Sequence, residues 1–337
     1  MFLIDKYVPT SFTDFEHNCK IFDVLNKMSR DNSLPHMIFY GKEGSGKKSI
    51  INIFLEKIYG PGVRNPTETI YYIKGSSNNI KPISVKQSNY HIVIEPNNNN
   101  FDKYIIQKIV KEYARRGPLL IGNNRVFRIV LINNLDKLSY YAQTSLRRTM
   151  EKFSTTCRFI MWTRSISRII DPIKSRCYCF RISSPSENKL FKIFMNIDQY
   201  ENFNYDFKIM NQIIQKSDYN IKKMLWITDL YKYNNTFENS YDIVINEIIS
   251  ILKEKNIFNL EKLRKCVYSI LKTNFNSTKI VKDITIKMTT DPTLSSKHKY
   301  KIVKNAAKYD YNLMLRRRDI IHIDAYLASV INILKNY

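Results

Sequence analysis

Cysteine is scarce in this sequence, and long apolar runs are missing. The 337 residues include five cysteines, which are too few and too scattered for a disulfide framework, and no Cys-x-x-Cys pair indicates zinc. No apolar run approaches the roughly 20 residues that cross a bilayer, and the first residues lack the basic and apolar segments of a secretory signal. We therefore expect a soluble protein of the cytosol or nucleus, with reduced thiols, no resident metal and no membrane partner.

Acidic residues are also under-represented. The chain has 54 Lys and Arg against 30 Asp and Glu, which gives a formal net charge of +24. Such an excess favours a phosphate-rich partner such as nucleic acid. The sequence is rich in Lys, Asn, Ile and Tyr throughout, however, and an AT-rich coding sequence would favour these residues without any DNA binding. Charge alone therefore leaves both interpretations open.

A strand, a glycine loop and a helix are expected in succession near the N-terminus. The apolar run His36–Tyr40 leads into Gly41-Lys-Glu-Gly-Ser-Gly-Lys47, and the apolar spacing from Ile50 to Ile58 is typical of a helix. The glycines let successive backbone N–H groups face a phosphate, and the lysine reaches the outer phosphates. The motif predicts a P-loop formed by Gly41, Gly44, Ser45, Gly46, Lys47, Lys48 and Ser49.

Two positions lack the groups that hold magnesium in a P-loop ATPase. The residue after Lys47 normally carries a hydroxyl group for the metal, but here it is Lys48. The next buried run, Val126–Ile132, ends in Asn133 and Asn134, where an ATPase needs carboxylates to bind the metal and position water. We predict a pocket that binds ATP or ADP without turnover and without a properly held magnesium ion; a loop kept only for structure is the alternative.

Further motifs identify a family. Leu135–Lys152 has the pattern of an amphipathic helix, and Cys157–Thr163 that of another buried strand. Four short motifs are Asp5-Lys-Tyr-Val-Pro9, Leu34-Pro-His36, Leu146-Arg-Arg-Thr-Met-Glu151 and Ile170-Asp-Pro-Ile-Lys-Ser-Arg-Cys177. Together they resemble a small subunit of replication factor C, the AAA+ clamp-loader family that opens sliding clamps and places them on primed DNA.

Three details resemble one eukaryotic small subunit in particular. They are the doubled lysine Lys47-Lys48, the segment Leu55–Gly60 and the segment Ser88–His91. That subunit stands at the end of the pentameric arc and has a degenerate ATP site. The resemblance implies that this chain, too, does not hydrolyse ATP by itself.

The resemblance implies a division of labour between subunits. Arg176 would stabilise the charge that develops on a neighbour's ATP, a contribution typically worth about 10³–10⁵ in rate; a solvated or salt-bridged arginine is the alternative. In the chain's own pocket, the resemblance assigns nucleotide contacts to Tyr7 and Val8. It aligns Arg164 and Lys222 with the family's polar sensor and sensing arginine, and both replacements argue against hydrolysis in cis.

Contacts with DNA and with a sliding clamp are also implied. Basic candidates that would follow DNA phosphates by shape are Lys86, Arg115, Arg116 and Arg125. Solvated surface charge is an equally good interpretation of each. Residues 101–110 have the pattern of an amphipathic helix that faces the clamp in the family. The candidates are Tyr104, Ile105 and Ile109. Those of them that are exposed would dock on the clamp, and packing in the core is the alternative.

An intersubunit role is open for the pair Arg147 and Arg148. Adjacent helical residues diverge by about 100°, so at most one of the two side chains faces a given partner. Surface solvation is the alternative interpretation of both.

We predict three domains: an α/β P-loop AAA+ domain with a parallel sheet at 1–183, a small helical lid at 184–239, and an all-α C-terminal collar at 240–337. The change at Ile182 supports the first boundary, because the capping residues Ser183–Glu187 begin a stretch with helical periodicity and no convincing strand. In the family, such a collar holds five subunits in a ring.

These features predict a subunit of a replication factor C-type heteropentamer that helps load a PCNA-like clamp onto primer–template DNA. One alternative is a self-sufficient AAA+ motor with unusual ligands, against which Asn133 and Asn134 count heavily. Another is a scaffold subunit of a damage-signalling clamp loader, which the sequence does not separate from the replicative one. The expected location is the nucleus in a cell, or a cytoplasmic replication factory if the Asn, Ile, Lys and Tyr bias reflects a large DNA virus.

Overall fold

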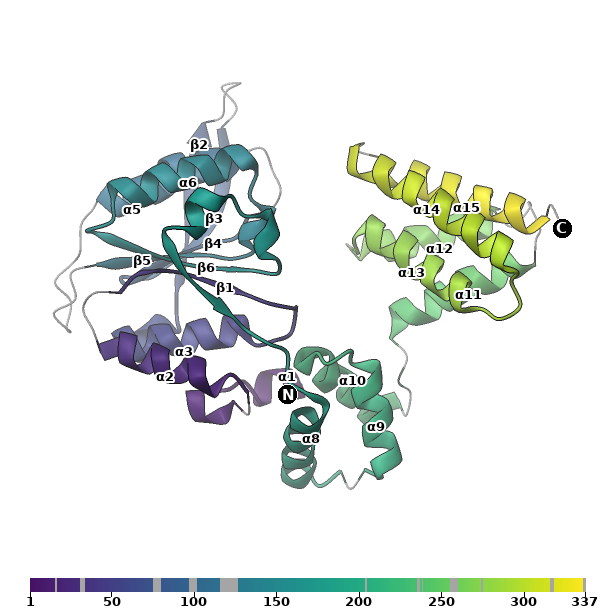
Figure 1. The fold of residues 1–337 in the computed structure, drawn as a ribbon, viewed down its shortest axis with the longest axis horizontal. Coiled ribbons are helices and arrows are strands. Elements are labelled where there is room, and N and C mark those ends of the chain that lie inside the picture. The colour runs from purple at the N-terminus through teal and green to yellow at the C-terminus, as the bar shows by residue number, and fades with distance from the viewer. Residues whose placement is uncertain are drawn as a thin grey trace. The chain divides into compact units, whose positions relative to one another are not determined.

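The computed structural model describes residues 1–15, 17–30, 34–74, 80–96, 102–115, 127–203, 205–234, 237, 239–254, 260–273, 275–315 and 318–335. The chain divides into two compact units, Met1–Asp229 and Leu230–Tyr337 (Figure 1). No helix in the described ranges is long and apolar enough to cross a membrane.

A seven-stranded sheet forms the centre of the first unit, in the order β2-β3-β4-β5-β6-β1-β7. The strands are β1 His36–Tyr40, β2 Thr67–Lys74, β3 Ile80–Gln87, β4 His91–Ile94, β5 Arg128–Ile132, β6 Cys157–Thr163 and β7 Cys177–Arg181. The strands from β4 to β7 in this order are parallel, whereas β2 and β3 add an antiparallel extension at one edge. Every residue of β5 is buried, as expected of a central parallel strand covered on both faces.

Helices cover both faces of this sheet (Figure 1). On one face lie α2 Cys19–Arg30 and α3 Lys47–Tyr59; on the other lie α6 Tyr140–Lys152 and a helical segment made of α4 Asp102–Tyr104, a π-helical stretch Ile105–Val110 and α5 Lys111–Arg115. Successive residues of a strand point to opposite faces, so Ile38 of β1 packs in the core with α6, whereas Phe39 packs in the core with α3. The predicted α/β P-loop fold is confirmed.

The predicted elements differ from the observed ones at their ends. The strands expected at 36–40 and 157–163 coincide with β1 and β6. The helix expected over 135–152 is instead a 3₁₀ turn, Leu135–Lys137, followed by α6. Ser139 separates the two, because its side chain accepts a hydrogen bond from the backbone N–H of Ala142 at 3.3 Å and so caps α6.

Helices α8 Glu187–Glu201, α9 Phe207–Lys216 and α10 Ile221–Asn234 follow the sheet. The N-terminal helix α1 Leu3–Lys6 is bound to this group: the Leu3 backbone N–H donates to Asp229 Oδ2 at 3.0 Å, and the Tyr7 hydroxyl donates to Glu201 Oε1 at 2.8 Å. The structure groups α8, α9 and most of α10 with the sheet in one compact unit, so the three-domain division stays a prediction.

In the described part of the second unit, every element is a helix: α11 Ser240–Lys253, α12 Leu260–Lys272, α13 Ser277–Thr290, α14 Ser296–Leu315 and α15 Asp319–Lys335. Its core is apolar, and α15 contributes the fully buried Tyr326. The Tyr326 hydroxyl lies 2.7 Å from Thr285 Oγ1 of α13, which gives this buried polar group a partner.

Candidate nucleotide-binding site

The P-loop connects β1 to α3, and two of its glycines are required by its geometry. Gly44 and Gly46 have φ of 76° and 84°, in the left-handed region that favours glycine. A Cβ atom on Gly44 would lie 1.8 Å from the side chain of Asn220, and one on Gly46 would lie 3.1 Å from the ring of Phe15. The loop backbone therefore packs directly against the residue that precedes α10.

Lys47 is the buried cation of this loop. The residue is 5% exposed, and Nζ donates to the carbonyl oxygens of Gly41 at 2.8 Å and Lys42 at 2.6 Å. Burial lowers the pKa of Lys47 to about 8, and the nearby Glu43 carboxylate only partly opposes this effect. A bound phosphate would favour the ammonium form and raise that pKa again.

A cleft of about 540 Å³ opens beside the loop and gathers most of the predicted nucleotide-binding residues. It is lined by Ile4, Asp5, Tyr7, Val8, Pro9, Phe15, Glu43, Gly44, Gly46, Lys47, Lys48, Ser49, Trp162, Arg164, Ile221, Lys222, Leu225 and Trp226. Polar loop groups thus face an apolar wall from the N-terminal segment and α10. Such a combination suits a nucleotide, because the wall can hold a base while the loop N–H groups hold phosphates.

Some residues of the cleft were not expected, and some expected residues do not line it. Gly41 and Ser45 belong to the loop but shape it from behind: Ser45 is fully buried, and its Oγ donates to the Lys42 carbonyl at 2.9 Å. Trp162 and Trp226 were not predicted from the sequence. Trp162 is half-buried in β6, as Arg158 is, and it packs partly against the core, so nothing in the sequence distinguished it from a core residue.

The first candidate metal position, Asn133, has both ends of its side chain occupied. Its Nδ2 donates to Glu95 Oε1 at 2.7 Å, and its Oδ1 accepts from Trp162 Nε1 at 2.7 Å. The residue is 2% exposed. A neutral amide held by two partners does not provide the anionic oxygen that magnesium prefers.

The neighbouring polar groups do not supply the missing carboxylate ligand. Asn134 has a left-handed backbone with φ of 49°, and its buried Oδ1 has no hydrogen-bond partner. The Asp136 carboxylate accepts a hydrogen bond from Thr163 Oγ1 at 3.0 Å. Across the described ranges, no group of three or more His, Cys, Asp or Glu side chains could hold a metal ion. The donor set therefore does not fit the magnesium ion of a hydrolysing P-loop site.

The two predicted sensor positions carry cations that line the cleft. Arg164 lies just after β6, and its Nη1 is 3.2 Å from Glu43 Oε2 of the P-loop. Lys222 comes from the first turn of α10. The cleft consequently has a positive lining around the loop, which suits a phosphate group.

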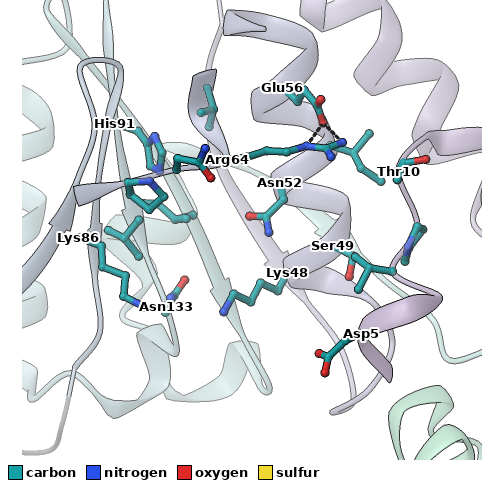
Figure 2. Close-up of a pocket in the computed structure, with 18 of the residues that line it drawn as sticks. Asp5, Thr10, Lys48, Ser49, Asn52, Glu56, Arg64, Lys86, His91 and Asn133 are labelled. Atoms are coloured by element: carbon teal, nitrogen blue, oxygen red, sulfur yellow. Dashed lines mark hydrogen bonds and ion pairs between the residues drawn. The ribbon is translucent and has the colours of Figure 1, made fainter. Parts of the chain in front are cut away.

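A second cleft, of about 810 Å³, adjoins the same loop (Figure 2). It shares Asp5, Val8, Pro9, Lys48 and Ser49 with the first cleft. Figure 2 shows the Lys48 side chain extending from α3 across this space toward Asn133, with Lys86 approaching from the opposite side. Lys48 therefore belongs to both spaces.

Arg176 is held in an ion pair on the surface. Its Nη2 lies 2.7 Å from Glu151 Oε1, and its Nη1 donates to the Pro172 carbonyl at 2.7 Å. Arg147 donates from Nε to the same Glu151 oxygen at 3.1 Å, whereas Arg148 is exposed. Hydrogen bonding by Arg147, assisted by Arg176, holds the pKa of Glu151 below its usual range. The salt-bridged alternative for Arg176 is thus the state found in the single chain.

The sheet register separates Arg176 from the P-loop of its own chain. Arg176 precedes Cys177, which pairs with His36 at the start of β1. The P-loop begins at Gly41, after the other end of β1. Five residues of extended chain span roughly 16 Å. Arg176 and the P-loop therefore lie at opposite ends of the parallel strands.

The remaining candidates have mixed outcomes. Lys86 and Arg115 are exposed, as a phosphate contact requires, and Lys86 Nζ lies 4.0 Å from Glu68. Arg116 and Arg125 lie outside the described residues. The clamp-contact prediction is wrong for Ile105 and Ile109, which are 7% and 2% exposed, because the apolar side of this segment packs into the core beside α6. Tyr104 is partly buried against the same core.

Comparison with known proteins identifies the family. Residues 17–186 match the model of the DNA polymerase III delta subunit, and residues 241–337 match that of the replication factor C subunit 3 C-terminal domain. A putative replication factor C small subunit of Acanthamoeba polyphaga mimivirus is 33% identical over 98% of this chain and 90% of that protein. A probable replication factor C subunit 3 of Dictyostelium discoideum is 31% identical, with 100% and 99% covered. Replication factor C subunit 3 of Homo sapiens is 28% identical, with 99% and 96% covered.

Among solved structures, a DNA polymerase III gamma subunit-related protein of Thermotoga maritima has a TM-score of 0.45 and 11% identity, over 92% of this chain and 99% of that one. One family model matches within each compact unit. The relatives match over nearly the whole chain, and the predicted resemblance is confirmed. This chain belongs to the replication factor C family of clamp-loader subunits, whose AAA+ P-loop fold is that of a nucleotide-binding protein.

Proposed function

We propose that this chain supplies Arg176 to the ATP site of a neighbouring subunit, while its own cleft binds ATP or ADP without hydrolysing it. The observation that carries this proposal is the sheet register. Arg176 lies at the end of β1 and β7 opposite to the P-loop, roughly 16 Å away along β1. A guanidinium at that distance does not contact the phosphates of its own chain, so it acts on a nucleotide held by another subunit.

The state of Arg176 supports a role in trans. It is 37% exposed at the side chain, lies at an edge strand of the sheet, and is oriented by contacts to Glu151 and Pro172. A guanidinium presented in this way can reach a phosphate on an adjacent surface. Its planar, permanently charged head stabilises the charge that develops on the transferred phosphoryl group.

The passive role of the chain's own cleft rests on missing carboxylates. Asn133 is bound to Glu95 and Trp162, and Asn134 has a neutral side chain. Neither residue can accept a proton from water or bind a metal ion as a carboxylate does. The P-loop and its buried Lys47 remain, so nucleotide binding is kept and hydrolysis is lost.

The partners follow from the family. We propose assembly with other replication factor C subunits into a heteropentamer that loads a PCNA-like clamp onto primer–template DNA during replication. The net charge of +24 supports contact with the phosphate backbone of DNA. Of the described candidates, Lys86 and Arg115 are exposed cations that could make such contacts. Its place of action would be the nucleus, or a cytoplasmic replication factory in an infected cell.

The test is the ATPase rate of the reconstituted complex with DNA and clamp present. Arg176→Ala should lower the rate at the neighbouring subunit's ATP site by about 10³ or more. The total ATPase rate should then fall by the fraction that this site contributes. Lys47→Ala should leave the total rate nearly intact, because this chain's own cleft is passive. Arg181→Ala is the matched control, since Arg181 is an exposed arginine at the other end of β7 with no role in the proposal. The proposal would be contradicted if Lys47→Ala strongly lowered the ATPase rate of the complex and Arg176→Ala left it unchanged.

A further inference from the structure

We propose that the Lys48 ammonium takes the place of the magnesium ion, so that this cleft selects nucleotide in its metal-free form. This inference rests on the passive site of the proposed function and adds the chemical form of its ligand. A P-loop site that hydrolyses ATP compensates phosphate charge with a lysine and a divalent cation. Here the second cation would be a side chain of the protein itself.

The position of Lys48 is the first support. It is the second residue of α3 and lines both clefts beside the P-loop. Figure 2 shows its side chain directed toward Asn133. The positions of Lys48 and Asn133 are the two that hold the metal in a hydrolysing P-loop site. The ammonium thus extends into the space between the two missing ligands.

The two replacements support each other chemically. A carboxylate at position 133 would attract the Lys48 ammonium and compete with a phosphate for it. Asn133 is neutral, and its Oδ1 accepts a hydrogen bond from Trp162. The Glu95 carboxylate also lines the larger cleft, but its Oε1 already accepts a hydrogen bond from Asn133 Nδ2. Lys48 is exposed and can therefore turn its charge to a phosphate oxygen. The structure accordingly favours an ammonium–phosphate contact where other P-loops place a metal–phosphate contact.

Charge repulsion gives the direction of the effect. A magnesium ion held by the nucleotide would approach Lys48, and also Lys47, whose Nζ is already buried in the loop. Like charges a few ångströms apart in a protein cleft repel strongly, so we expect magnesium to weaken binding by about tenfold. ADP carries one negative charge fewer than ATP, and two lysines compensate it more completely. Metal-free ADP is therefore the expected preferred ligand.

The test is a fluorescence titration of the full chain with a labelled ADP, in excess EDTA and in excess magnesium. The wild type should bind about tenfold more tightly in EDTA. Lys48→Met keeps the length of the side chain but removes its charge, so it should weaken binding in EDTA about tenfold and remove the difference between the two conditions. The double variant Lys48→Thr, Asn133→Asp restores a hydroxyl and a carboxylate, so its binding should become tighter in magnesium.

The matched control is Lys27→Met, which removes an exposed cation of α2 that is not among the residues lining either cleft, so it should bind as the wild type does. Thermal unfolding of each variant shows that it is folded. Tighter binding of the wild type in magnesium, an unaffected Lys48→Met variant, or no binding in either condition would each overturn this inference. None of these results bears on Arg176, because the ATPase test reads the neighbour's site and not this one.

Discussion

Glu151 should position Arg176 for work on the neighbour's nucleotide. The two shortest contacts of the guanidinium are to the Glu151 carboxylate of α6 at 2.7 Å and to the Pro172 carbonyl of α7 Asp171–Lys174 at 2.7 Å. Glu151→Gln removes the charge of the first contact. The Pro172 carbonyl remains, but it lies only four residues before Arg176 in the chain and so restrains the side chain less. The side chain then samples more rotamers, and we expect the neighbour's turnover to fall about three- to tenfold, the cost of ordering one long side chain.

The expected loss is much smaller than that of Arg176→Ala, because Gln at position 151 leaves the guanidinium present. Stability should hardly change, since Glu151 and Arg176 are 40% and 37% exposed at the side chain and exposed ion pairs contribute little. If Glu151 only stabilised the fold, Glu151→Gln would lower the thermal midpoint and leave kcat unchanged. A positioning role lowers kcat at the neighbour's site and leaves KM for ATP unchanged.

The assay is ATP turnover of the reconstituted complex as a function of ATP concentration. Arg147→Met is the control, because it removes the other cation from Glu151 but leaves the pair with Arg176 in place. Glu151→Asp keeps the charge and should recover part of the rate. If Glu151→Gln raised the turnover, the ion pair would be a restraint that assembly must break, and the positioning role would be refuted.

Two further perturbations address the chain's own cleft. Lys47 has a pKa of about 8 in the free protein, and a phosphate favours its ammonium form, so ADP binding takes up a proton above that pH. Affinity should be flat below pH 8 and fall by up to about tenfold per unit above it, whereas Lys47→Arg should show no such fall; a flat wild-type titration to pH 9.5 would be inconsistent with this. Gly44→Ala should destabilise the first unit by about 1–2 kcal/mol, from its left-handed backbone and the contact with Asn220. In urea unfolding, the double variant Gly44→Ala, Asn220→Ala should lose less free energy of unfolding than the two single variants lose together. Strictly additive losses would show that the two side chains do not meet.

The central parallel strands and the P-loop could be predicted closely from the sequence. The runs His36–Tyr40 and Cys157–Thr163 match β1 and β6 in their bounds, because strands buried on both faces have almost uninterrupted apolar sequences. The glycine loop was recognisable because phosphate binding restricts its residues to a fixed spacing. Local sequence decides both features.

The antiparallel extension could not be predicted in the same way. Its strand β2 carries Ile70 and Tyr72 exposed, at 62% and 74%, and β3 includes Pro82, which argues against a strand in the sheet interior. One face of this extension is covered, since Ile73 and Val85 are buried in the core, but apolar residues also stand on its exposed face, so the sequence shows no clean alternation. Pairing between β2 and β3 specifies the extension, and pairing is not a local property.

Burial of Ile105 and Ile109 illustrates a different limit. The pattern over 101–110 correctly indicated an apolar face, but an apolar face packs equally well on its own sheet or on a partner. Only the fold shows that α6 and the sheet cover it. The hydrogen bonds of Asn133 to Glu95 and Trp162 were hidden for the same reason, since the three residues come from three different strand ends.

Arg176 and the cleft lie at opposite ends of the parallel strands of the first unit. Arg176 is oriented by Glu151 and Pro172, near the start of β7, whereas the cleft is formed beyond the opposite end of β1. Replacing the metal ligands of the cleft therefore leaves the geometry of Arg176 untouched. The proposed function depends on this separation, because a subunit that loses hydrolysis in its own site would then still be able to complete the site of a neighbour.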